Sequence, residues 1–282
     1  MSITTPTAPT IDEAAPQPDP NAPVITFDHV SIGFEGKKVL EDISFTVSRG
    51  ETLIILGPAG GGKSVLMKLC DGLLQPDSGN ITVFGREISH LKEEELYSAR
   101  AHIGMVFQES ALFDSLTVRD NVAYRLIEEH LPDEEVDRRV REALRFVELE
   151  DKIDKFPSEL SGGMRRRVSI ARAIISGPDL LLYDSPTAGL DPITSTTIVE
   201  LIIKQRDVSH NTALLITHRL QDAVTLVSHR YNQQTKAMEP LPEGQLDENT
   251  RFMMLNEGHI VFEGTTAEFI LSDDPFIRDY LS

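Results

Sequence analysis

The first stretch that could do chemistry is "GPAGGGKS", Gly57 to Ser64, which fits the pattern G-x-x-x-x-G-K-[ST]. It follows the apolar run "TLIILG" and opens a helical pattern, which is the context that this motif requires. Glycines let the backbone curl until its N–H groups and the helix N-terminus face an anion. Lys63 then offers a cation to the β- and γ-phosphates of a nucleotide, and Ser64 offers a hydroxyl to Mg²⁺. The predicted phosphate-binding residues are Gly57, Pro58, Ala59, Gly60, Gly61, Gly62, Lys63, Ser64 and Val65.

A second candidate group is Asp184, which ends the apolar run "DLLLYD". A carboxylate at the end of a buried strand beside such a loop can hold Mg²⁺ through water. A nucleotide-hydrolysing chain is expected to carry another carboxylate at the next position, where this chain has Ser185. A serine hydroxyl cannot act as a general base at neutral pH, and general-base assistance contributes about 10²–10⁴-fold. The sequence therefore predicts intact nucleotide binding with slow hydrolysis.

A third candidate is "ELSGGMRRRVSIARAI", in which Ser161, Gly162 and Gly163 precede a helical pattern. A hydroxyl and bare backbone at a helix N-terminus form an anion site. Taken alone, this motif is typical of a helix N-cap. Two phosphate-binding motifs in one chain suggest that each chain offers its second motif to the nucleotide of a partner chain.

These groups need a framework, and the pattern of the chain predicts one. "VITFDHVSIGF" and "VLEDISFTV" alternate like strands, whereas "TLIILG", "DLLLYD" and "TALLITH" read as strands buried on both faces. The chain from about Lys92 to Leu149 is predicted to be mostly helical, and "FMMLNEGHIVFEG" to be a closing hairpin. Strands that alternate with helices predict an α/β fold with a largely parallel sheet, interrupted by a helical insert.

Two segments fall outside this pattern. Residues 1–23 are rich in Pro, Ala and Thr and are predicted to be a disordered tail. Residues 229–251 are polar and without period, and are predicted to be a long loop or insertion. The net charge of -18 argues against non-specific binding to nucleic acid. Cys70, the single cysteine, is predicted to be a core residue in a reducing cytoplasm, and no apolar run is long enough to span a bilayer.

From Val24 to the C-terminus, the chain resembles the ATP-binding subunits of ABC transporters. The family's motifs occur in the family's order: the Walker A loop, Gln108 as the Q-loop, LSGG, Asp184 of Walker B, "AGLD" ending at Asp191, and His218. The resemblance implies the ABC ATPase fold, with a P-loop (RecA-like) core, an antiparallel β subdomain and an inserted helical subdomain. The implied division is 24–108 and 166–228 for the core with the β subdomain, 109–165 for the helical subdomain, 229–251 for the insertion, and 252–282 for a C-terminal hairpin and helix.

The same resemblance implies a head-to-tail dimer in which ATP and Mg²⁺ lie between the Walker A loop of one chain and Ser161, Gly162 and Gly163 of the other. Asp191 would contribute to this dimer contact. Phe34 matches the aromatic residue that stacks on adenine. Gln108 would coordinate Mg²⁺ together with Ser64 and Asp184, and would sense the γ-phosphate, which His218 would contact. The implied catalytic set is Lys63, Gln108, Asp184, Ser185 and His218.

Three stretches, "LSGGMRRR", "FQESALFDSLTVRDNVAY" and "DDPFIRDYL", also resemble the ATPases of Mla/Mce-type lipid transport systems. This resemblance implies transport of phospholipids or other lipids in the bacterial envelope, at the cytoplasmic face of the inner membrane. It implies an integral-membrane permease of the MlaE type, which would insert a coupling element beside Gln108. An MCE substrate-binding protein and a small STAS-type partner are implied as well, and no nucleic acid is.

Ser185 leaves several explanations open at this point. The protein is a slow motor, or Glu109, Asp191 or His218 replaces the missing base, or the chain is a degenerate half of a heterodimer. An introduced substitution is a further explanation. The competing functions are an ATP-gated clamp without turnover, a transporter subunit with another substrate, and an ABC protein that acts on ribosomes or DNA, which the acidic charge disfavours.

Overall fold

The computed structural model describes residues 22–281, so the predicted disordered tail lies outside the described part of the chain except for its last two residues. The centre of the fold is a six-stranded sheet with the order β12-β11-β3-β8-β7-β6. Three of its strands are the predicted buried ones, and every residue in them is buried. They are β3 (Thr52–Leu56), β7 (Leu180–Asp184) and β8 (Thr212–Ile216).

Both faces of this sheet are covered, because alternate residues of the central strands belong to two different hydrophobic cores. Ile54 and Leu56 pack into one core, whereas Leu53 and Ile55 pack into the other. Strands covered on both faces are expected to be continuous apolar runs in the sequence. This explains why "TLIILG", "DLLLYD" and "TALLITH" could be recognised without the structure.

Two further parallel strands and one antiparallel strand complete the sheet. The edge strand β6 (Ile103–Val106) lies within the region predicted to be mostly helical, and it was not identified from the sequence. It has only four residues, of which two are buried, so it carries no clear strand signal. At the other edge, the predicted closing hairpin is confirmed as β11 (Thr250–Asn256) and β12 (His259–Thr265), and β11 also pairs in parallel with β3.

A second, antiparallel sheet has the order β2-β1-β4-β5 and confirms the strands predicted near the start of the chain. Its buried side chains share a core with helix α1 and with one face of β3, so α1 packs between the two sheets. Cys70 is buried in this core, as predicted. The elements are β1 (Ile25–Phe34), β2 (Lys37–Val47), β4 (Ser78–Val83), β5 (Arg86–Glu87) and α1 (Lys63–Cys70).

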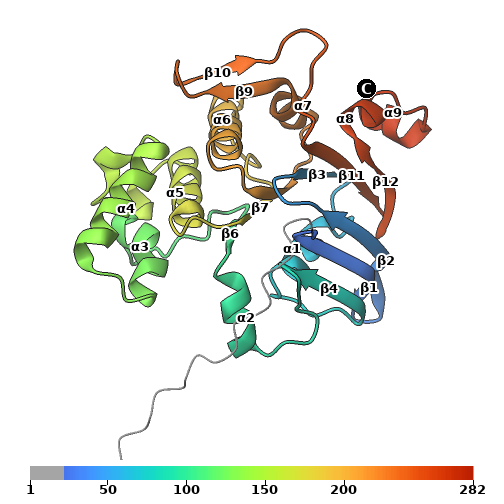
Figure 1. Ribbon diagram of the computed structural model, residues 1–282, viewed down its shortest axis with the longest axis horizontal. Coiled ribbons are helices and arrows are strands. Elements are labelled where there is room, and N and C mark those ends of the chain that lie inside the picture. The colour runs from blue at the N-terminus through green and yellow to red at the C-terminus, as the bar shows by residue number, and fades with distance from the viewer. Residues whose placement is uncertain (1–21, 282) are drawn as a thin grey trace, which may run out of the picture.

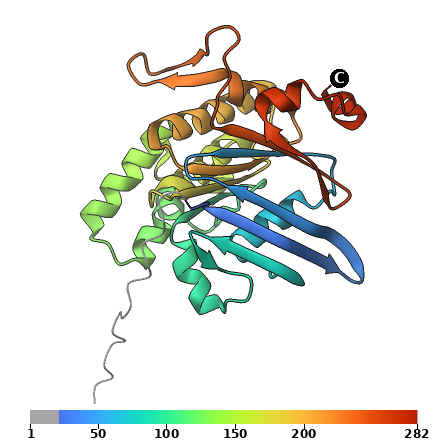
Figure 2. The same cartoon turned by 45° about the vertical axis from the view of Figure 1, so that its right-hand side comes forward.

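The helical part of the molecule lies on the opposite side of the central sheet from the antiparallel sheet (Figure 1, left and lower right). Its helices α3 and α4 contact α5, which continues against the edge strand β6. Seen from the second direction, α3 and α4 stay at the outside and α5 runs in toward the sheet (Figure 2). The elements here are α3 (Val118–Glu128), α4 (Asp133–Phe146), two short 3-10 turns (Glu150–Lys152 and Pro157–Glu159) and α5 (Gly162–Ile174). Helix α2 (Glu93–Arg100) instead lies beside the antiparallel sheet and contributes Leu96 to the core of that sheet (Figure 1).

The segment predicted to be a long loop contains a β-hairpin, which corrects that prediction. The hairpin consists of β9 (His229–Asn232) and β10 (Ala237–Pro240) and projects beside α6 (Figure 1, top). Its strands are polar and half exposed, so no hydrophobic period marks them in the sequence. The adjoining helices are α6 (Pro192–Ser209) and α7 (Leu220–Ser228).

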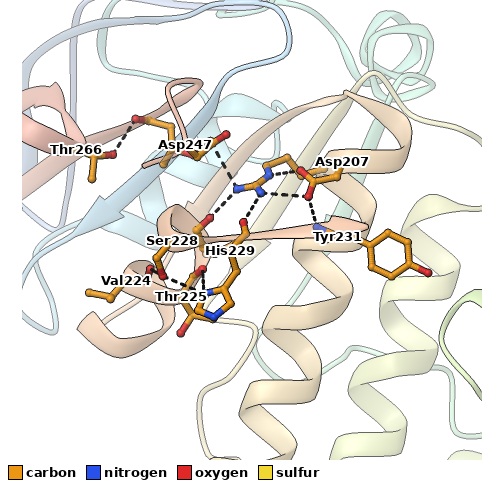
Figure 3. A network of polar contacts seen from close by, with 11 residues as sticks. Asp207, Val224, Thr225, Ser228, His229, Tyr231, Asp247 and Thr266 are labelled. Carbon is orange, nitrogen blue, oxygen red and sulfur yellow. Dashed lines mark hydrogen bonds and ion pairs between the residues drawn. The ribbon is translucent and has the colours of Figure 1, made fainter. Parts of the chain in front are cut away.

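A polar network centred on Arg206 of α6 anchors the hairpin (Figure 3). The Arg206 guanidinium donates to the carbonyl oxygens of Leu226 and His229 at 2.6 and 2.8 Å, and it pairs with Asp207 at 2.7 Å and Asp247 at 3.6 Å. Asp207 in turn accepts the backbone N–H of Tyr231 at 2.6 Å. Because charged donors make stronger hydrogen bonds than neutral ones, this cluster compensates for the missing apolar pattern.

The chain ends in the short helices α8 (Thr266–Ile270) and α9 (Pro275–Leu281), which lie next to the β11–β12 hairpin (Figure 1). Among residues 22–281, no helix is long and apolar enough to cross a membrane.

Candidate nucleotide-binding site

The loop between β3 and α1 holds the predicted phosphate-binding residues, and Lys63 is its centre. The Lys63 side chain folds back over the loop, where Nζ donates to the carbonyl oxygens of Gly57 at 2.9 Å and Pro58 at 2.7 Å. Burial lowers the pKa of Lys63, and the nearby carboxylate of Asp184 acts against this shift. Gly62 at the N-cap gives α1 no side-chain cap, and the first turn has no acidic residue. The loop therefore combines a held cation with helix N–H groups that are left for an anion.

Two glycines in the loop are required by close approach of other backbone. Gly57 has φ 135°, and a Cβ there would overlap the carbonyl oxygen of Leu255 in β11. Gly62 has φ 91°, and a Cβ there would lie 2.6 Å from Cδ2 of Leu40. L-residues with side chains rarely adopt these conformations. The loop is thus packed against β11 on one side and β2 on the other.

The predicted magnesium ligands Ser64 and Asp184 are brought together. Ser64 is the second residue of α1, Asp184 is the last residue of β7, and Ser64 Oγ donates to Asp184 Oδ1 at 3.2 Å. Asp184 is almost fully buried. Hydroxyl and carboxylate oxygens are the ligands that Mg²⁺ prefers, together with water and phosphate. This pair therefore fits the metal half of a Mg-nucleotide site.

A cavity of about 430 Å³ opens above the loop. It is lined by Val39, Ala59, Gly60, Gly61, Gly62, Lys63, Ser64, Val65, Gln108, Ser185, Ile216 and His218. Gln108 and His218, far apart in the sequence, thus meet at one cavity with the phosphate-binding loop. Val39 and Ile216 were not singled out from the sequence, because an apolar residue in a strand carries no signal that distinguishes a cavity wall from a core.

Ser185 follows β7 directly and faces this cavity with φ 47°, a left-handed conformation. Its backbone N–H donates to the carbonyl oxygen of Ile216 at 3.0 Å, which fixes the turn against β8. Of the three groups suggested as replacement bases, His218 lines the cavity. Glu109 is exposed and is not among the lining residues. Asp191 is engaged elsewhere, since its carboxylate accepts the N–H of Thr194 at 3.0 Å.

Phe34 is the predicted adenine-stacking residue, and the structure does not bring it into the cavity. It lies at the end of β1 with 44% of its surface exposed, and it is not among the lining residues. Val39 lines the wall on the neighbouring strand β2. An exposed aromatic ring can stack on a flat ligand.

The signature residues lie apart from this cavity, at the start of α5. Ser161 is the N-cap, and its Oγ accepts the N–H of Met164 at 3.2 Å. A Cβ at Gly163 would overlap the Thr194 side chain, so Gly163 is required for packing of α5 against α6. Gly162 is exposed, and a Cβ there would meet nothing closer than 3.7 Å. Asp191 caps α6 beside them. Ser161 and Gly162 therefore present an open surface rather than a pocket.

Comparisons with known proteins agree with this geometry. A family model described as ABC transporter matches residues 40–188. The methionine import ATP-binding protein MetN of Bifidobacterium longum (strain NCC 2705) is 42% identical over 205 residues, which is 70% of this chain and 51% of that protein. The chain thus spans about half the length of this relative.

A relative from Arabidopsis thaliana, protein TRIGALACTOSYLDIACYLGLYCEROL 3, chloroplastic, is 36% identical over 256 residues, which is 88% of this chain and 70% of that protein. Among solved structures, a dimeric ATP-binding cassette in a post-hydrolysis state with ADP and Pi has a TM-score of 0.72 at 27% identity and covers 86% of this chain and 98% of its own. The cbiO1 protein of Clostridium perfringens, part of an ABC transporter complex, has a TM-score of 0.73 at 26% identity and covers 91% and 94%.

The family model covers more than half of the chain, and the Arabidopsis relative covers most of it. The α/β fold with its P-loop core is the one predicted, and ATP with Mg²⁺ is the cofactor of this type of domain. The chain belongs to the ABC transporter family, as one of its ATP-binding chains with an ABC ATPase domain.

Proposed function

We propose that this chain is the ATP-hydrolysing subunit of a lipid transporter, held by a permease of MlaE type at the cytoplasmic face of a bacterial inner membrane. The observation that carries the lipid assignment is the relative that aligns with 88% of the chain and is named for a galactolipid, trigalactosyldiacylglycerol. The stretches "LSGGMRRR", "ALFDSLTV" and "DDPFIRDYL" support the same assignment through their resemblance to Mla/Mce-type ATPases. An MCE substrate-binding protein and a STAS-type partner belong to this proposal.

Within the site, Lys63 and the N-terminus of α1 bind the phosphates, and Phe34 stacks on the adenine. Ser64, Asp184 and Gln108 hold Mg²⁺, which when bound neutralises the charge that develops on the phosphate oxygens. His218, which lines the same cavity, contacts the γ-phosphate. Phosphoryl transfer depends mostly on positioning and charge stabilisation, so these residues support turnover even though Ser185 supplies no base.

For the water-handling role we propose His218, in place of the missing carboxylate. It is the one candidate among Glu109, Asp191 and His218 that lines the cavity with Ser185. A histidine side chain is a common general base in enzymes, whereas a serine hydroxyl is not. Loss of an optimally placed general base slows the chemical step by about 10²–10⁴-fold, so a weaker base predicts a slow motor rather than a dead clamp.

We further propose a head-to-tail homodimer. The exposed surface at Ser161 and Gly162 has a helix N-terminus and lies outside the cavity that Lys63 lines. A nucleotide held in the cavity of one chain would complete that surface in the other. A heterodimer with a chain that carries the missing carboxylate is the alternative, and the mass of the purified complex distinguishes the two.

The permease contact is proposed at a groove of about 330 Å³ between β6, α3 and α5. Its walls include Phe113 and Tyr124, whose rings lie 5.0 Å apart, and three arginines, Arg100, Arg125 and Arg172. Phe113 is 45% exposed and belongs to the stretch "ALFDSLTV". Apolar rings framed by cations fit a short helix with an apolar face and acidic ends.

A second candidate function is methionine import, because the MetN relatives are more identical over the part that they share, at 42%. The test isolates the tagged chain with its permease from the native membrane and reconstitutes the complex in nanodiscs. We expect phospholipid or galactolipid to raise the ATPase rate about threefold or more, and L-methionine to leave it unchanged. Stimulation by L-methionine alone would assign the chain to amino-acid import instead.

A further inference from the structure

The three consecutive arginines that follow the signature glycines point to different parts of the molecule. Arg165 donates to the Leu160 carbonyl oxygen at 2.6 Å, and Arg167 donates to the Val147 carbonyl oxygen at 3.1 Å. Both contacts stay within the helical part of the chain. Arg166 alone of the three reaches the core sheet, where it is 4% exposed.

The contacts of Arg166 join the ends of two neighbouring parallel strands. Its Nη1 donates to the carbonyl oxygen of Ser185 at 3.3 Å, and its Nη2 donates to the carbonyl oxygen of Gln108. Ser185 directly follows β7, and Gln108 follows β6 by two residues. Because β6 and β7 are paired in parallel, both carbonyls lie at the carboxyl edge of the sheet, next to the cavity. One planar guanidinium thus spans the two loops.

Arg166 makes these contacts as a buried charge without a carboxylate partner. Within residues 22–281 the hydrogen bonds of Arg166 go to backbone carbonyl oxygens, and its Nε has no hydrogen-bond partner. Burial lowers the pKa of the guanidinium, while the carboxylates of Asp184 and Glu109 act in the opposite direction. A buried charge that is only partly compensated is costly for folding, so stability alone does not account for an arginine at this position.

We propose that Arg166 is a positioning residue that fixes Gln108 and Ser185 relative to each other and ties both to the signature helix α5. The proposal rests on the assignment of the cavity as a Mg-ATP site. A planar guanidinium that donates from both Nη1 and Nη2 fixes the spacing of the loops at Gln108 and Ser185. An ammonium group lacks this fixed geometry. Gln108 then presents its side chain to the metal from a fixed backbone. Through the same side chain, a change at the cavity is passed to Ser161 and Gly162 at the start of α5.

The test measures how much Mg²⁺ strengthens the binding of a fluorescent ATP analogue to the full chain. In Arg166→Gln we expect this Mg²⁺-dependent gain in affinity to fall about tenfold, because residues that orient metal ligands commonly contribute this much. The affinity without Mg²⁺, which depends on Lys63 and the loop, is expected to change by less than about twofold. Arg167→Gln is the matched control, since it removes the neighbouring arginine, which is half-buried and whose contact stays in the helical part.

Arg166→Lys separates geometry from charge, and it carries the test if Arg166→Gln does not fold. Lysine keeps the positive charge but cannot donate to both carbonyl oxygens in the fixed geometry of a guanidinium. We therefore expect the Mg²⁺-dependent gain in affinity to stay about threefold or more below that of the natural chain. Full recovery in Arg166→Lys, or an equal gain in Arg166→Gln and Arg167→Gln, would overturn the proposal. If the natural chain itself showed no gain from Mg²⁺, the assignment of the cavity would fail instead, which is a different outcome.

Discussion

The starts of α1 and α5 share a local motif, a glycine pair and a serine at a helix N-terminus. Only at α1 does the structure bring further side chains of a nucleotide site next to that motif. At α1, the N-terminus is uncapped, Lys63, Gln108 and His218 line a cavity there, and Asp184 accepts a hydrogen bond from Ser64. At α5, Ser161 caps its own helix and Gly162 faces outward. A helix N-terminus therefore does not make a nucleotide site by itself. The converging strands make the site at α1, and in the proposed dimer the start of α5 meets a nucleotide held by another chain.

Loss of the cation at the complete site is expected to have the largest effect. Lys63→Ala removes the lysine that lines the cavity. We predict that its ATP affinity falls by about a hundredfold or more, so that binding is not detected at ordinary ATP concentrations. Ser161→Ala, by contrast, should act only under conditions that favour the dimer. Calorimetric titration at low and high protein concentration checks both variants. Undiminished affinity in Lys63→Ala would refute the assignment of the loop.

The two signature glycines should separate packing from recognition. Gly163→Ala is expected to lower the free energy of unfolding by about 2 kcal/mol, because the added methyl overlaps Thr194. Thr194 cannot turn away cheaply, since its N–H and Oγ1 are both bonded to Asp191. Gly162→Ala should change the free energy of unfolding by less than about 0.5 kcal/mol. Urea unfolding measures both, and Thr194→Ser should restore most of the loss in Gly163→Ala. Equal destabilisation by the two variants would contradict the packing shown here.

Ser185 tests how complete the first site is. Ser185→Glu restores a carboxylate beside Asp184, and we predict single-turnover hydrolysis that is about tenfold faster or more. In the matched control Ser185→Gln, the new side chain is nearly the same size as Glu but cannot act as a base. Its hydrolysis rate should therefore equal that of the natural chain. Rapid-quench measurements of product formation decide the matter. Equal rates for the natural chain and Ser185→Glu would show that Ser185 does not limit the chemical step.

The far end of α1 offers the smallest expected effect. Asp71 is the C-cap of α1, and burial raises its pKa from 3.8 to about 6. Between these values the folded state binds more protons than the unfolded state, so this group's contribution to stability falls as pH rises and stays low above pH 6. Asp71→Asn cannot ionise, so the variant does not lose this stability as pH rises. We predict an unfolding free energy about 1 kcal/mol above that of the natural chain at pH 8 and nearly equal at pH 4, measured by urea unfolding. A difference independent of pH would show that Asp71 is not the titrating group.

The sequence was sufficient where local pattern and fold agree. The central strands are buried on both faces, so their apolar runs identified them, and the loop glycines follow from their motif. It was insufficient where order comes from distant side chains. The polar hairpin at β9 and β10 depends on Arg206 and its carboxylates, which no local period encodes. No sequence pattern singled out Arg166, and only the meeting of β6 and β7 beside α5 shows its position in the site.

Because Gly57 packs against Leu255 in β11, the phosphate-binding loop reaches its final packing only after β11 has been synthesised. The phosphate-binding loop is encoded in the first quarter of the chain, but β3 pairs with β8 and β11, which are synthesised late. Long-range parallel pairing of this kind delays folding. A growing chain on the ribosome therefore carries its glycine loop without the wall that shapes it, and the ability to hold ATP arises only when the last strands have emerged.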